Sequence, residues 1–152
     1  MLIFGGAYDW MKIPSRWRLV RELCRKSSML SSDLGGNQTW GNSTAISRVG
    51  AAYNVIQSIP GVSTGKVIVF GQSMGALSAL NWTRINKSKV CAIVLLIPVI
   101  NLNDLAQSPQ YGSNVNNAYG GYSDAIYGAT NNPLICSRNG DFNNIPILMK
   151  IS

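Results

Sequence analysis

Short, continuous apolar runs recur along this chain and predict its β-strands. Such runs suit the strands of a parallel sheet, which are covered on both faces. They lie at 1–4, 67–70, 90–97 and 145–151, and a weaker candidate lies at 29–32. Segments with a helical period separate most of these runs. Strands that alternate with helices indicate parallel strands joined by crossover helices.

Three segments carry the apolar spacing of helices, at 15–26, 44–58 and 74–86. The middle segment has the clearest apolar stripe, with Asn42 or Ser43 in front of it as the N-cap. We therefore predict an α/β fold in three layers, α/β/α, with a mostly parallel sheet of about five strands and helices on both faces.

The interval 101–144 differs in kind, because it is rich in Asn, Gly, Ser and Tyr and has little apolar periodicity. A low-complexity linker is one interpretation. However, a linker without function is not expected to contain four tyrosines, Tyr111, Tyr119, Tyr122 and Tyr127. In addition, ordered loops longer than about 15 residues usually carry function. We favour a lid-like insertion at 101–144 within a single domain over 1–152.

Composition and charge restrict the class of protein. The chain has 152 residues, of which 46% are apolar and 12% are charged, so it can bury a core and is unlike a disordered protein. Its formal net charge is +7, and five basic residues fall in the helix predicted at 15–26. A phosphate-binding surface is one interpretation of this helix. A solvated face is favoured, because no nucleic-acid motif accompanies it, and we expect no nucleic-acid partner.

The cysteines and the apolar runs bear on metal sites and location. Cys24, Cys91 and Cys136 are widely spaced and form no C-x-x-C pair, so neither a disulfide framework nor a zinc site is indicated. The longest uninterrupted apolar run, 92–97, is far shorter than the roughly 20 residues that span a bilayer. The first residues also lack a charged leader. These features favour a cytoplasmic protein with no metal site and no membrane association.

The stretch Gly71-Gln72-Ser73-Met74-Gly75 is the strongest functional signal. It is a G-x-S-x-G motif after an apolar strand and before a helix, where a serine nucleophile occupies a strained turn. Gly71 and Gly75 fit this turn because larger side chains would collide across it. The N–H of Met74 would then stabilise an oxyanion. The alternative is that Ser73 merely occupies a strand-to-helix turn.

With this motif the chain resembles the α/β-hydrolase superfamily over most of its length. The segment 3–9 is similar to the glycine loop that supplies the second oxyanion donor, which assigns that role to the N–H of Ala7. Closer similarity to short-lidded serine esterases of bacteria and their phages lies at 40–42, 97–99 and 118–121. The resemblance implies hydrolysis of small carboxylic esters through an acyl-serine intermediate, with Ser73 as the nucleophile. No metal or organic cofactor is expected, because the sequence has no ligand cluster.

The chain contains no histidine and so lacks the usual base for a serine nucleophile. In the superfamily the acid and the histidine follow the serine in chain order. We therefore expect the chain to be truncated before both residues and to be a weak or inactive catalyst by itself. A non-catalytic binding protein that keeps the fold and lacks the base is the alternative function, and the oligomeric state stays open.

Few charged residues offer a substitute for the missing acid and base. Asp104 follows a predicted strand but has no imidazole to orient. Lys66 begins the strand that Ser73 ends, so it is expected at the opposite edge of the sheet. Asp141 is expected in a solvated turn, and Asp33 resembles a structural turn residue of the superfamily.

Overall fold

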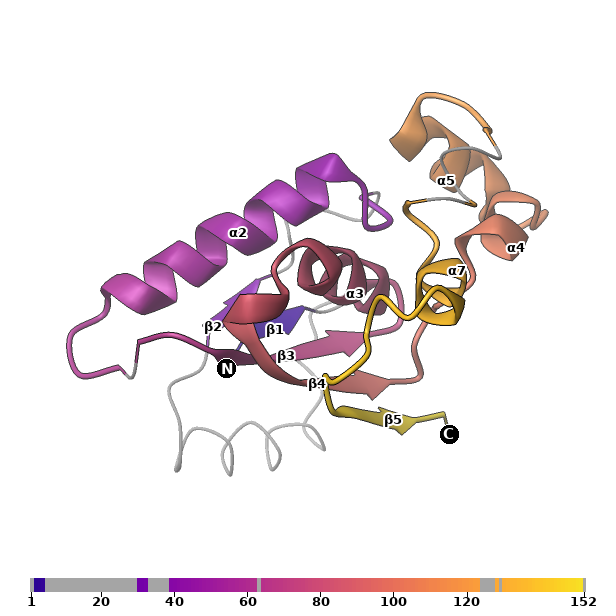
Figure 1. Cartoon of the computed structure of the whole chain (residues 1–152). Coiled ribbons are helices and arrows are strands. Elements are labelled where there is room, and N and C mark those ends of the chain that lie inside the picture. Colours follow the sequence, from indigo (N-terminus) through magenta and orange to yellow (C-terminus); the bar gives the residue numbers. More distant parts are fainter. Residues whose placement is uncertain are drawn as a thin grey trace.

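The strands form one parallel sheet in the order β2-β1-β3-β4-β5 in the computed structural model (Figure 1). The structure describes residues 2–4, 30–32, 39–62, 64–123, 128 and 130–151, with the backbone alone for the first two ranges. The strands are β1 (Leu2–Phe4), β2 (Leu30–Ser32), β3 (Val67–Gln72), β4 (Val90–Leu96) and β5 (Ile147–Lys150). The predicted α/β fold with a parallel sheet is confirmed, and β3 to β5 form the part of the sheet whose side chains are described.

Two long helices cover one face of this sheet. Helix α2 (Ser43–Ser58) joins β2 to β3, and α3 (Gly75–Ile85) joins β3 to β4. Both connections advance in the same direction across the sheet, so right-handed crossovers place both helices on the same side (Figure 1). The helix predicted at 15–26 lies outside the described residues. In the described part of the chain, helices therefore cover one face of the sheet. The predicted third layer, with helices on the other face, is not among the described residues.

Local signals set the start of α2 and the burial of α3. The Oδ1 of Asn42 accepts a hydrogen bond from the N–H of Ala45 at 3.1 Å, which satisfies one of the free donors in the first turn of α2. Val49 and Ile56 then place the apolar face of α2 in the larger cluster of buried apolar residues, here called the main core. The main core consists of Ala45, Val49, Ile56, Val67, Val69, Ala76, Ala79, Leu80, Trp82, Val90, Ile93, Leu95, Cys136 and Phe142. Helix α3 is buried from Gly75 to Thr83, because it contacts the sheet, α2 and α7 (Pro133–Arg138).

The described part of the interval 101–144 also contains the short helices α4 (Leu102–Ala106) and α5 (Gly112–Tyr119), which contact each other beyond the carboxyl ends of the strands (Figure 1). We call α4, α5 and the residues between them the cap. Its buried residues form one apolar cluster with residues near Ser73, here called the cap cluster. The cap cluster consists of Trp40, Met74, Leu77, Leu102, Ala106 and Val115. Helix α7 instead joins the main core through Cys136.

The longest described helix, α2, has 16 residues. Among the helices in the described ranges, none combines the length and the apolar character that crossing a membrane requires.

Candidate active site

Ser73 lies at the bend between β3 and α3. Its φ angle is +49°, a left-handed conformation that L-residues seldom adopt. Met74 follows with helical angles as the N-cap of α3, and the carbonyl of Ser73 accepts from the N–H of Ala76 at 3.0 Å. The side chain of Ser73 is half-buried. The sequence motif predicts a serine in a strained strand-to-helix turn, and the backbone of Ser73 has this conformation.

Gly71 allows the helix to approach the strand closely. A Cβ atom at Gly71 would lie 2.7 Å from the Cα of Ala76 and 3.0 Å from the Cβ of Ala79, which is closer than packed atoms permit. The second glycine of the motif, Gly75, is buried as the first residue of α3. The bend therefore depends on small residues on both sides of it.

Ile97 is the neighbour of Ser73 across the sheet. The last register pair of β3 and β4 joins Gln72 to Leu96, and the N–H of Ser73 donates to the carbonyl of Leu96 at 3.2 Å. The N–H of Val99 donates back to the carbonyl of Ser73 at 3.1 Å. Ile97 lies between these two bonds and also has a left-handed backbone, with φ at +40°. Two adjacent strands are thus each followed directly by a residue with a left-handed backbone.

The strand order places Ser73 where open parallel sheets bind ligands. The chain moves from β1 to β2 on one side, and then continues to β3 on the other side of β1. Such a reversal opens a crevice outside the carboxyl ends of the two central strands. Phe4, the last residue of β1, pairs with Gly71 of β3. Ser73 follows two residues later, at the carboxyl end of a strand that borders this reversal.

A tight turn at 39–42 contacts α3 near the same end of the sheet. The N–H of Asn42 donates to the carbonyl of Thr39 at 2.8 Å, and both central residues, Trp40 and Gly41, have positive φ angles of 43° and 73°. A Cβ atom at Gly41 would lie 2.8 Å from the Cβ of Leu77. The glycine is therefore needed both for the turn and for its contact with α3.

Trp40 is held between this turn and the cap. The hydroxyl of Tyr119 donates to the carbonyl of Trp40 at 2.8 Å, and the ring of Tyr111 lies 5.7 Å from the indole ring. The indole is buried in the cap cluster with Met74, and its Nε1–H has no hydrogen-bond partner in the described part of the chain. A bulky residue in a left-handed conformation with an unpaired donor is unusual.

Lys66 lies far from the bend. It is exposed and immediately precedes β3, whose six residues separate it from Ser73 by about 20 Å of strand. Lys66 is therefore at the opposite edge of the sheet, as predicted. Asp104 is exposed in the first turn of α4, on the cap.

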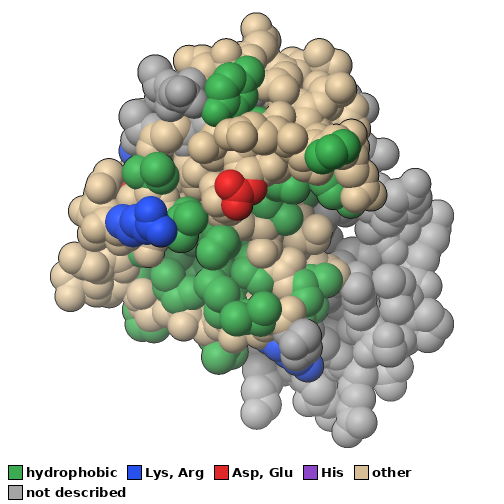
Figure 2. All heavy atoms as spheres, turned by 90° about the vertical axis from the view of Figure 1, so that its right-hand side faces the viewer, with side chains coloured by type: hydrophobic (Ala, Val, Ile, Leu, Met, Phe, Trp, Pro, Cys, Tyr) green, Lys and Arg blue, Asp and Glu red, His purple; other side chains and the backbone are tan. Residues whose placement is uncertain are grey.

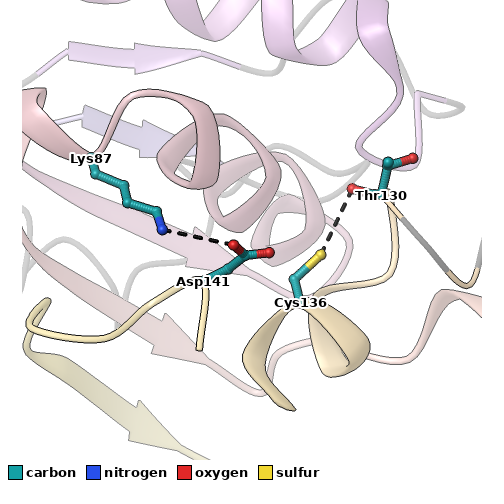
Figure 3. Close-up of polar contacts among 4 residues, drawn as sticks. All are labelled: Lys87, Thr130, Cys136 and Asp141. Carbon is teal, nitrogen blue, oxygen red and sulfur yellow. Dashed lines mark hydrogen bonds and ion pairs between the residues drawn. The ribbon is translucent and has the colours of Figure 1, made fainter. Parts of the chain in front are cut away.

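Asp141 belongs to another polar cluster, at the far end of α3 (Figure 3). Its Oδ1 lies 3.7 Å from the Nζ of Lys87, and the nearby thiol of Cys136 points to the carbonyl of Thr130 at 3.8 Å. Lys87 follows the 11 residues of α3, so its backbone lies about 16 Å from the start of that helix. Asp141 lies in a turn with 33% of its side chain exposed, as expected, and it is also paired with Lys87, which the sequence did not predict.

The start of α3 supplies the electrostatic part of the site. The first N–H groups of a helix and its dipole favour negative charge, and Met74 is the N-cap of α3. Ala7, the second expected donor, lies outside the described residues.

Burial raises the pKa of the Cys136 thiol, so this cysteine is a protonated core residue rather than a nucleophile. In the described ranges, no group of three His, Cys, Asp or Glu side chains could hold a metal ion.

Sequence reasoning missed the left-handed conformation of two residues at this end of the sheet, Trp40 and Ile97. Neither residue type favours positive φ angles, so composition and periodicity carry no signal for them. One signal was present for Trp40, because Gly41 follows it and glycine commonly occupies a turn that requires positive φ.

The chain matches no model of a known protein family. A search of curated proteins likewise finds no match.

Proposed function

We propose that this chain is a serine hydrolase of the α/β-hydrolase type that acts on small carboxylic esters. The single observation that carries the proposal is the left-handed backbone of Ser73 at the bend between β3 and α3. A strained turn of this kind exposes a serine hydroxyl at the end of a central strand. The half-buried side chain of Ser73 and the reversal of strand order beside β3 give further support.

In the proposed reaction, the Oγ of Ser73 attacks the carbonyl carbon of the ester. The hydroxyl proton passes to a base and then to the leaving alcohol, while the ester C–O bond breaks. Water then attacks the acyl-serine, which releases the carboxylic acid and restores the hydroxyl of Ser73. The N–H groups of Met74 and Ala7 would donate to the oxyanion in both steps.

The sequence of this chain supplies no histidine as the base, so we expect slow turnover by the chain alone. The wider parts of the proposal are a three-layer domain with 101–144 as its lid, a cytoplasmic location and a small-molecule ester as partner. Neither nucleic acid nor a membrane is expected as a partner.

A binding protein that keeps this fold without catalysis is the second candidate function. The absence of histidine is the observation that favours it. Such a protein would bind the ester at the same bend and would form no covalent bond to Ser73.

Added imidazole separates the two functions, because it can act as the missing base. The chain is mixed with p-nitrophenyl acetate at increasing imidazole concentrations, and acetylated peptides are identified by mass spectrometry. We expect imidazole-dependent acetylation of Ser73 that is absent from Ser73→Ala. Ser78→Ala should retain it, because Ser78 is buried in α3, the helix that follows Ser73. A chain that is not acetylated at Ser73 at any imidazole concentration would leave the binding protein as the function.

A further inference from the structure

Strand β5 forms one edge of the sheet and exposes apolar side chains on both of its faces. It pairs with β4 on one side, and no described residue pairs with it on the other side. All four of its residues are exposed, with Leu148 at 68% and Met149 at 41%, and Ile151 follows at 75%. Protein sheets usually protect such edges with charges, prolines or bulges, because an open edge pairs readily with another chain.

An apolar surface continues from β5 to the neighbouring strand. The N–H of Ile97 donates to the carbonyl of Lys150 at 2.7 Å, and Ile97 is 46% exposed. The carboxyl end of β5 lies on the right-hand side of Figure 1. Figure 2 shows this side of the molecule, where hydrophobic side chains gather in the lower half. Contiguous apolar surface of this kind is typical of protein interfaces.

The hydrogen bonds to β4 determine which backbone groups of β5 face outward. The carbonyl of Pro146 accepts from the N–H of Ile93 at 2.9 Å, and the carbonyl of Lys150 accepts from the N–H of Ile97. Along a strand, the backbone groups of successive residues point alternately to the two sides. The residues whose N–H and C=O groups face away from β4 are therefore Ile147, Met149 and Ile151.

We infer that two copies of this chain pair through their β5 strands, antiparallel and related by a two-fold axis, and so form one continuous sheet. The register centred on Met149 uses every outward-facing residue. Met149 lies opposite Met149 of the second copy, and Ile147 lies opposite Ile151 of the second copy. Each of these opposed pairs exchanges two backbone hydrogen bonds. This inference is independent of the proposed function.

The position of the one charged residue of β5, Lys150, fits this self-pairing. In the register centred on Met149, Lys150 lies opposite Leu148 of the second copy. A register centred on Lys150 would instead place the two lysines directly opposite each other, which is destabilising. Apart from Lys150, β5 is apolar, so a second β5 supplies apolar neighbours for its exposed side chains. Two-fold pairing occupies the free edge of both copies, so the assembly closes as a dimer.

Sedimentation velocity at rising protein concentration tests the dimer. We expect the mass to rise from the 16.4 kDa of one chain to twice that value. Met149→Lys places two like charges opposite each other at the two-fold axis and should weaken the dimer by about tenfold or more. Ile85→Lys is the matched control, since Ile85 is 56% exposed at the last residue of α3, and should dimerise as the wild type does. Circular dichroism establishes that both variants are folded.

Cysteine cross-linking tests the register. In a background of Cys24→Ser and Cys91→Ser, Met149→Cys should form a disulfide between two copies under mild oxidation, because the Cα atoms of this opposed pair lie about 5.5 Å apart. Leu148→Cys is the matched control. Leu148 is more exposed than Met149, but its two copies would lie on a diagonal about 7–8 Å apart, which is beyond the reach of a disulfide.

Three results would overturn the inference. The wild type could remain a monomer or grow beyond a dimer, which would exclude closed pairing. Met149→Lys could dimerise as well as Ile85→Lys, which would place the contact elsewhere. Leu148→Cys could cross-link as fast as Met149→Cys, which would indicate random collision of exposed thiols.

Discussion

Three residues with left-handed backbones, Trp40, Ser73 and Ile97, come from three separate segments and lie near the carboxyl ends of β3 and β4. Each such conformation costs roughly 1–2 kcal/mol for an L-residue. The surrounding structure offsets this cost, for example through the N–H of Ile97, which donates to the carbonyl of Lys150 at 2.7 Å. Strain of this kind persists where the fold over-determines it, and it gathers at active sites and ligand clamps.

The variant Gly71→Ala should destabilise the chain by about 2 kcal/mol. The reason is that the new Cβ atom would lie 2.7 Å from the backbone of Ala76, and overpacking in a core costs roughly 1–3 kcal/mol. Urea unfolding followed by circular dichroism measures the change. Gly50→Ala is the matched control, because Gly50 lies inside α2 with its nearest neighbour, Trp82 Nε1, at 3.6 Å. Gly50→Ala should raise the free energy of unfolding by up to about 1 kcal/mol. A change of the same sign in Gly50→Ala and Gly71→Ala would contradict this account.

At the scale of elements, Asn42 connects two parts of the molecule. Its Oδ1 caps α2, and its Nδ2 donates to the carbonyl of Ala118 in α5 at 2.8 Å. Tyr119 adds a second bond from the same helix to the turn at 39–42. These bonds fix the cap against the start of α2, next to the cap cluster that contains Met74.

Substitutions at Asn42 should separate its two roles. Asn42→Ala loses the cap, worth about 1 kcal/mol, and the bond to Ala118, worth about another 1 kcal/mol. Asn42→Ser keeps a capping oxygen and should lose only the second contribution. Urea unfolding midpoints measure both, and Asn54→Ala, on an exposed part of α2, should change stability by less than about 0.5 kcal/mol. Equal losses in the serine and alanine variants would show that the bond to α5 dominates.

The sequence predicted the elements that have strong local signals. Continuous apolar runs identified β3 and β4, and the cap at Asn42 with its apolar stripe identified α2 to within one residue. It did not predict α4, α5 and α7, because these helices have five, eight and six residues and are too short to show a helical period. Their stability comes from tertiary packing rather than from propensity.

The same contrast holds for the candidate site. The motif predicted the bend at Ser73 and the small residue at Gly71, because the chemistry of the turn restricts both positions. It carried no information on Ile97, whose place beside Ser73 follows from strand register. It also carried none on the cap cluster, which joins residues from Trp40 to Val115. Contacts between distant segments are a property of the folded chain.

At the scale of the whole molecule, two apolar clusters support different ends of the sheet. The main core lies between the sheet, α2 and α3, and the cap cluster lies near the carboxyl ends of the strands. Helix α7 continues the chain from the cap to the main core, where Cys136 is fully buried. The Nζ of Lys87, which follows α3, lies 3.7 Å from the Oδ1 of Asp141 in the turn after α7. The stability of the main core is therefore coupled to the segment that follows the cap.

The burial of Cys136 makes the stability of the main core depend on pH. Burial raises the pKa of the thiol above its ordinary value of 9.0; the charge of Arg84 opposes this shift, and the charge and hydrogen bond of Asp141 add to it. As the pH rises, the thiol ionises first in the unfolded chain, which lowers the free energy of the unfolded state relative to the fold. The contribution of Cys136 to stability is thus complete below about pH 9 and is lost as the pH rises toward the folded pKa.

Urea unfolding of the wild type and Cys136→Ala at about pH 8 and about pH 10 tests this dependence. Cys136→Ala should be the less stable protein at the lower pH, since it leaves a small cavity in the core. The difference in stability should shrink at the higher pH, because the alanine variant has no thiol at this position to ionise on unfolding. Cys91→Ala is the control for loss of a cysteine, since Cys91 is exposed, and it should leave no cavity in the core. A difference for Cys136→Ala that does not change with pH would mean that the thiol ionises equally in the folded and unfolded chain.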